Sequence, residues 1–263
     1  MLETMTLMAI GALAGLLAGL FGVGGGLIVV PALAFWLPSK GLPAGEVLHI
    51  AVATSLAAIG VTALASAWTH LRRGAVDLRT LGWLAPGLLV GSGGGALIVA
   101  HVPRVPLTLF VAAFCAYAGW QILRAARVQP AQVARVETGV LLPAGLGIGA
   151  VSAAVGIGGG SLTVPFLHRA GVDLRRAIAT SAAAGLPIAI AGTVGYLYAP
   201  GVPGMSAWSV GLVDFKLALA IGSLSVLTAP IGAMLAHRWP VARLKQGFAG
   251  WLLLVAVMLV VKL

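Results

Sequence analysis

The stretch that decides the fold is GVGGG at residues 22–26, because the chain uses the same phrase twice. GIGGG stands at residues 156–160, displaced by 134 residues, and each copy is followed at the same spacing by a proline and a leucine (Pro31 and Leu33, Pro165 and Leu167). A long internal repeat of this kind indicates two related halves. Four glycines within five residues continue a helix poorly, so each copy predicts a helix break.

The composition places these breaks inside a membrane protein. Hydrophobic residues make up 60% and charged residues 8% of the 263 residues, and the mean hydropathy is +1.07. A soluble domain carries about 25% charged residues. The formal charge is +10, but the basic residues cluster at the ends of apolar segments, which suits orientation in a membrane better than nucleic-acid binding. With Cys115 as the single cysteine, we expect no disulfide, no metal site and no cofactor.

The lengths of the apolar stretches divide the chain into two repeats, 1–125 and 138–263, joined by a linker at 126–137. Ordinary spans are predicted at about 47–71, 80–103, 105–123, 177–199, 215–237 and 243–262. The glycine-bearing segments, 5–37 and 138–168, are longer. As unbroken helices they would reach roughly 45 Å, against a hydrocarbon core of about 30 Å. Because the first 39 residues hold no Lys or Arg, we expect this start to be retained rather than removed as a secretory signal.

The basic residues decide how the long segments lie. If all eight segments crossed the membrane, the four basic clusters would be split evenly between its two sides. If the glycine-bearing segments return to the side they entered, twelve of the sixteen basic residues face the cytoplasm, as the positive-inside rule requires. The sequence therefore predicts an all-α integral membrane protein with a cytoplasmic linker. Its two inverted repeats each consist of a re-entrant, broken helical hairpin plus three transmembrane helices.

The hairpin tips are the predicted binding site. Broken backbone at membrane depth is tolerated where it is buried in protein or lines a wet cavity, and a helix that restarts there offers N–H groups to a small anion. Hydroxyls from an A-T-S phrase in each half would complete the shell. The alternatives are that the glycines serve helix packing and that the hydroxyls bond backbone carbonyls. The predicted substrate-binding residues are Gly22, Gly24, Gly25, Gly26, Thr54, Ser55, Gly156, Gly158, Gly159, Gly160, Ser161, Thr180 and Ser181.

The ionisable residues refine the expected substrate. All six acidic residues fall at segment ends or in loops, which disfavours a cation as the substrate, since cation carriers place carboxylates inside spans. Asp77 and Asp214 occupy equivalent positions, either as helix caps or with a role in transport. His49 is a candidate for proton coupling, because it precedes Thr54 by one to two turns.

Taken together, the duplicated G-x-G-G-G-x4-P-x-L phrases and the A-T-S phrases at 53–55 and 179–181 resemble the sulfite exporter TauE/SafE family of bacterial membrane transporters. The resemblance covers essentially the whole chain. It implies a multi-pass protein of the bacterial cytoplasmic (inner) membrane that exports sulfite or an organosulfonate such as sulfoacetate. With the tip site, it suggests a secondary transporter that works by alternating access. A passive anion channel is the alternative, and a membrane-embedded enzyme is disfavoured. The expected partners are the small anion and the lipid bilayer, without nucleic acid, and a homodimer is left open.

Overall fold

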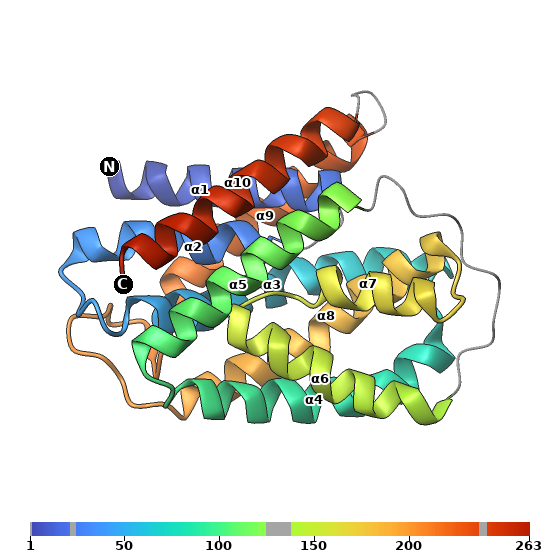
Figure 1. The fold of residues 1–263 in the computed structure, drawn as a ribbon, viewed down its shortest axis with the longest axis horizontal. Coiled ribbons are helices and arrows are strands. Elements are labelled where there is room, and N and C mark those ends of the chain that lie inside the picture. Colours follow the sequence, from blue (N-terminus) through green and yellow to red (C-terminus); the bar gives the residue numbers. More distant parts are fainter. Residues whose placement is uncertain (1, 22–24, 125–137, 237–240) are drawn as a thin grey trace.

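The computed structural model describes residues 2–21, 25–124, 138–236 and 241–263 (Figure 1). The predicted linker, Gly22, Gly24 and residue 237 of the predicted span 215–237 lie outside the described residues. The α-helices are α1 (Leu2–Phe21), α2 (Gly26–Trp36), α3 (Val47–Arg72), α4 (Leu78–Val99), α5 (Arg104–Arg124), α6 (Thr138–Val155), α7 (Gly160–Arg169), α8 (Leu174–Leu197), α9 (Phe215–Ala236) and α10 (Val241–Val261). A 3-10 helix, η1 (Leu37–Lys40), follows α2, and the strands β1 (Ser209–Val210) and β2 (Val213–Asp214) form a short antiparallel ribbon before α9.

Both glycine phrases coincide with helix breaks. Helix α1 ends at Phe21 and α2 begins at Gly26, while α6 ends at Val155 and α7 begins at Gly160. The short arms α2 and α7 have 11 and 10 residues, so each is about 15 Å long, half the thickness of a hydrocarbon core. Figure 1 shows each short arm running back toward the end from which its long arm came. The two hairpins open toward opposite ends of the bundle.

The helices have the length and surface of membrane helices. Within the described ranges, six are long and apolar enough to span a membrane: α3, α4, α5, α6, α8 and the Phe215–Gly232 part of α9. Large apolar side chains lie on their outer faces, including Val90, Ile98 and Leu227, each about two-thirds exposed. An apolar outer surface of this kind suits a lipid environment and not water. The predicted class, an all-α integral membrane protein, is confirmed.

The two halves are interlocked by packing that is the same in both directions. Helix α1 of the first half packs against α9 of the second, and α6 of the second packs against α4 of the first. At the centre α3 packs against α8, and α5 packs against α10. Every one of these pairings is preserved when the halves are exchanged. That is the arrangement expected of repeats related by a pseudo-twofold axis, although the inverted orientation of the halves in a membrane stays a prediction.

Small residues allow the long hairpin arms to approach their partner helices. A Cβ on Gly91 of α4 would lie 2.9 Å from the Cα of Leu146 on α6, and one on Gly15 of α1 would lie 2.6 Å from the Cα of Ser225 on α9. The Ser225 hydroxyl also donates a hydrogen bond of 2.9 Å to the Gly11 carbonyl. Such contacts between backbones are typical of small-residue interfaces in membranes. The glycines at 91 and 95 therefore serve close packing of α4 against α6.

Candidate functional site

The two helix breaks touch each other inside the bundle. A Cβ on Gly26 would collide with the carbonyl oxygen of Gly156 and would lie 2.9 Å from the Cα of Ile157. Gly156 itself has φ of +73°, and a Cβ there would lie 2.9 Å from the carbonyl oxygen of Val52. A side chain on Gly26 would force the breaks apart, whereas one on Gly156 would press on the backbone of Val52 in α3. The positive φ of Gly156 also favours glycine. The backbone of each break therefore forms part of the wall around the other.

The two breaks differ in conformation. Gly159, the N-cap of α7, is left-handed with φ of +75°, whereas its counterpart Gly25 is right-handed with φ of −69°. A Cβ on Gly159 would lie 2.5 Å from the Ile188 side chain, while one on Gly25 would make ordinary contact with Ala14 at 3.5 Å. Two other predicted glycines belong to the second break. A Cβ on Gly158 would lie 2.9 Å from the Ile59 side chain, and Gly160 is the first residue of α7.

A cluster of buried hydroxyl groups surrounds the second break. Ser152 and Thr163 are fully buried, and Ser161 is 8% exposed. A Cβ on Gly159 would lie 3.4 Å from the Ser152 oxygen and 3.3 Å from the Thr163 oxygen, so both hydroxyls border the break. None of the three has a hydrogen-bond partner in the described chain. We call Ser152, Ser161 and Thr163 the hydroxyl cluster.

The lack of partners in the hydroxyl cluster is unusual for helical Ser and Thr. Such residues commonly donate to a carbonyl of the preceding turn, as Thr108 does to Arg104 at 2.8 Å and Thr228 to Leu224 at 3.0 Å. A buried hydroxyl left without a partner costs about 1–3 kcal/mol. The hydroxyl cluster therefore holds donors and acceptors that the described residues leave unused.

Backbone amides at the start of α7 add to the same site. The N–H groups of Leu162 and Thr163 donate to the Gly159 carbonyl at 3.0 and 2.7 Å. The preceding amides, of Gly160 and Ser161, lie in the first turn, where a helix has no carbonyl of its own to offer them. With the positive end of the helix dipole directed the same way, the second break presents hydroxyls and amides but no charged side chain.

The threonines of the A-T-S phrases bind the opposite half of the molecule. Thr54 accepts a hydrogen bond of 3.1 Å from the amide of Asp214, and Thr180 accepts one of 2.9 Å from the amide of Asp77. The two bonds are equivalent when the halves are exchanged. Each threonine thus secures the start of a helix from the other half, and its oxygen is engaged by the protein itself.

Asp77 and Asp214 act as helix caps, as one of the two interpretations predicted. The Asp77 carboxylate accepts from the Thr80 amide at 3.1 Å and from the Thr80 hydroxyl at 2.7 Å, and Asp214 accepts from the Leu217 amide at 3.1 Å. Burial alone would raise the pKa of Asp77. The hydrogen bonds from the Thr80 amide and hydroxyl and the Arg79 amide, with the nearby Arg176 guanidinium, outweigh burial and hold the pKa of this carboxyl below its usual value.

The serines of the A-T-S phrases differ from each other. Ser55 donates a hydrogen bond of 2.8 Å to the carbonyl of Gly156, which fastens the second break to α3. Ser181, its counterpart on α8, is 2% exposed and its hydroxyl has no partner in the described chain. Of the predicted hydroxyl ligands, Ser161 and Ser181 are therefore free, whereas Thr54, Ser55 and Thr180 hold the backbone.

His49 lies at the start of α3 and binds a loop. Its Nε2 is 2.9 Å from the Val102 carbonyl oxygen, and its Nδ1 is 3.8 Å from the Glu46 carboxylate. Neither partner belongs to a helix break, so the proton-coupling role of His49 stays a prediction. Asp77, Asp173 and Asp214 all lie at helix starts. The described ranges hold no group of three His, Cys, Asp or Glu residues that could bind a metal ion.

Sequence reasoning missed two members of the hydroxyl cluster, Ser152 and Thr163. The repeat itself carried the signal that could have found them. At the shared displacement of 134 residues, Ser152 corresponds to Ala18, Ser161 to Leu27 and Thr163 to Val29. The second half thus replaces three apolar residues of the first with hydroxyl residues, all around the same break.

The fold and the site together define a class of protein. Two opposed helical hairpins whose broken backbones meet inside a bundle of apolar helices are an arrangement found in membrane transporters. The family model described as sulfite exporter TauE/SafE matches residues 7–259, and the chain belongs to this family. The protein is a multi-pass membrane transporter and not an enzyme.

Several curated relatives are named as probable membrane transporter proteins. A probable membrane transporter protein of Haemophilus influenzae is 33% identical over 259 residues, covering 96% of each chain. Probable membrane transporter proteins of Methanocaldococcus jannaschii and Bacillus subtilis are 25% and 26% identical, covering 86% and 89% of this chain and 84% and 91% of theirs. No solved structure matches this chain significantly.

Proposed function

We propose that this protein is a secondary transporter that exports a small oxyanion, sulfite or an organosulfonate such as sulfoacetate, and that the second helix break binds it. The observation that carries this proposal is the hydroxyl cluster beside the N-terminus of α7. Three buried hydroxyls without partners among the described residues, beside the first-turn amides and the positive end of a helix dipole, suit an oxyanion. The name of the family, sulfite exporter, points to the same chemistry.

The position of the carboxylates supports an anion over a cation. Asp77, Asp173 and Asp214 each cap a helix through backbone amides, so their charge is already directed to helix starts. Cation carriers commonly place a carboxylate among the ligands of a membrane-embedded site, and the hydroxyl cluster contains none.

The distribution of basic residues supports export across a cytoplasmic membrane. Helices α3, α5 and α7 end, and α8 begins, at the right-hand end of the bundle in Figure 1. Arg72, Arg124, Arg169, Arg175 and Arg176 belong to these helix ends. A concentration of arginine at one end indicates the cytoplasmic side. In a bacterium this side faces the cytoplasm across the inner membrane, so export would begin at this end of the bundle.

Alternating access is the proposed mechanism because the breaks touch. Contact between Gly26 and Gly156, with the hydroxyl cluster buried beside it, favours a site exposed to one side at a time over a permanently open channel. The reciprocal bonds of Thr54 and Thr180 join the two halves where they would move against each other.

The experiment is transport into proteoliposomes by the purified protein, measured with sulfite, sulfoacetate and, as a cation control, potassium. We expect saturable, gradient-coupled anion flux, and no potassium flux. The double variant Ser152→Ala, Thr163→Val should lower anion flux at least about tenfold, because each lost hydroxyl removes a hydrogen bond to a charged group. The mirror variant Ala18→Ser, Val29→Thr in the first half is the matched control. Equal flux in the wild type and the double variant would reject the site, and unsaturable flux would indicate a channel.

A further inference from the structure

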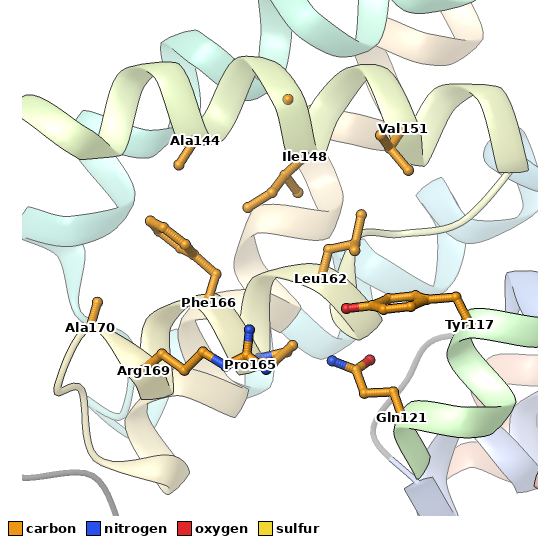
Figure 2. Close-up of a pocket in the computed structure, with 11 residues that line it drawn as sticks. Tyr117, Gln121, Ala144, Ile148, Val151, Leu162, Pro165, Phe166, Arg169 and Ala170 are labelled. Carbon is orange, nitrogen blue, oxygen red and sulfur yellow. The ribbon is translucent and has the colours of Figure 1, made fainter. Parts of the chain in front are cut away.

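A groove lies between α5 and both arms of the second hairpin (Figure 2). Its volume is about 570 Å³. The groove is formed by α5 on one side, α6 on the second and α7 on the third, so it follows the hairpin that carries the hydroxyl cluster.

The groove has an apolar wall and a polar rim. Ile148, Leu162 and Phe166 form much of the wall, and Gln121 and Arg169 contribute polar groups. Figure 2 shows the side chains of Arg169 and Gln121 extending toward the same region beside Pro165. Arg169 is exposed and makes no hydrogen bond or ion pair with any residue of the described chain. Its guanidinium is thus available for an anionic group, for which its planar donor fork is well suited.

The size of the groove favours an organic ligand. Pockets for organic ligands have volumes of about 300–1,000 Å³, and the groove falls within this range. An inorganic oxyanion of a few atoms would leave most of it unfilled and would make no use of the apolar wall. A ligand with an acidic head and a short apolar chain would use both parts.

The groove adjoins the hydroxyl cluster. Val151 lines the groove and is followed in α6 by Ser152, while Leu162 lines it from between Ser161 and Thr163 in α7. Because consecutive residues of a helix point about 100° apart, the groove and the hydroxyl cluster lie on neighbouring faces of the same two helix segments.

We propose that this groove binds a transported substrate, and that this substrate is an organic anion with a short apolar chain. The acidic head binds Arg169 and Gln121, and the chain packs on Phe166 and Leu162. The inference rests on the proposed anion transport and adds the class of anion and the place where it first binds. Arg169 and Phe166 then determine selectivity, while the hydroxyl cluster receives the oxyanion during transport.

Gly147 offers a direct test, because it lines the groove and a Cβ there would meet no atom within 4 Å. Gly147→Phe places a large side chain in the groove, starting from a Cβ that meets no neighbouring atom. Gly94→Phe is the matched control, since Gly94 also has open space around its Cβ but lies on α4, outside the groove. Binding of sulfite, methanesulfonate, ethanesulfonate and butanesulfonate to the full-length protein in detergent is measured by titration calorimetry.

In the wild type and Gly94→Phe, we expect affinity to rise about two- to fourfold for each added methylene, as burial of apolar surface predicts. In Gly147→Phe this rise should vanish while sulfite binding is unchanged. Arg169→Gln should weaken binding of every sulfonate about tenfold. Arg175 is an exposed arginine at the start of α8, outside the groove. Arg175→Gln should leave the affinity for sulfonates within about twofold of the wild type.

Several results would overturn the groove, and one of them would also overturn the proposed function. Equal affinity across the sulfonates, or equal effects of Arg169→Gln and Arg175→Gln, overturns the groove while transport through the hydroxyl cluster stands. Stabilisation by phosphatidylglycerol that Gly147→Phe abolishes, without any effect on sulfonate binding, identifies a lipid groove and also overturns it. If neither sulfite nor any sulfonate binds the wild type, both the groove and the proposed function are wrong.

Discussion

The two helix breaks share one backbone design and differ in side chains. Each follows a long arm and touches the other break. Around the first break the corresponding residues are Ala18, Leu27 and Val29, and around the second they are Ser152, Ser161 and Thr163. The helix break is therefore duplicated, while at these three pairs of positions only the second copy carries hydroxyl groups. A repeat can keep its architecture in both halves and place its chemistry in one.

The strongest test of this comparison is contact between the breaks. Gly26→Ala adds a methyl that collides with the Gly156 carbonyl. Because the obstacle is backbone, the breaks must separate, at a cost of about 1–3 kcal/mol or more. We expect anion flux in proteoliposomes to be lost, with a thermal unfolding midpoint several degrees lower.

Gly25→Ala is the control for Gly26→Ala. Its Cβ would make ordinary contact with Ala14 at 3.5 Å and its φ of −69° suits alanine. Flux and thermal stability should remain close to those of the wild type. If Gly25→Ala and Gly26→Ala have the same effect on flux, contact between the breaks is not what makes glycine necessary.

The packing of the helices around the breaks should contribute equally to stability in the two halves, even though the breaks themselves differ. Gly15→Ala on α1 and Gly91→Ala on α4 each place a methyl against the backbone of a partner helix, on α9 and α6 respectively. We expect each to lower the free energy of unfolding by about 1–3 kcal/mol. Gly94→Ala, whose Cβ meets nothing, should have no such cost. A large effect at only one of the two interfaces, measured by unfolding in detergent, would show that the halves are not equivalent as scaffolds.

The reciprocal threonine bonds give a finer comparison. Thr54→Val and Thr180→Val each remove an acceptor from the amide of an aspartate in the other half. Asp214 is buried, with 6% exposure, whereas Asp77 is partly exposed and water can replace the lost partner. We expect Thr54→Val to cost about 1–3 kcal/mol and Thr180→Val less than about 1 kcal/mol. Unfolding of both variants under one set of conditions checks the order, and the reverse order would contradict the assigned burial.

Sequence patterns predict the fold of this chain better than its site. Glycine phrases and apolar lengths indicate where helices break, because backbone freedom and bilayer thickness are local constraints. The partners of Thr54 and Ser55 depend instead on how distant helices pack, and no spacing along the chain reports that Ser55 donates to Gly156. Ser152 and Thr163 escaped prediction for a related reason. Single hydroxyls in apolar helices commonly bond their own helix, and only the packed structure reveals that these do not.

The smallest expected effect concerns the capping carboxylate of the first half. Asp77→Asn keeps a side chain that caps α4 well but removes the negative charge near Arg176. Because the pKa of Asp77 is lowered in the folded protein, the charge stabilises the fold fully above about pH 4, the ordinary range of the group. This stability is lost as the pH falls through the lowered pKa. At neutral pH the variant should therefore be less stable by only a few tenths of a kcal/mol, since the group is partly exposed. Thermal unfolding in detergent at neutral pH and in steps below about pH 5 should give curves that converge in acid. A difference that grows as the pH falls would mean that the Asp77 charge destabilises the fold, contrary to its hydrogen bonds with Thr80.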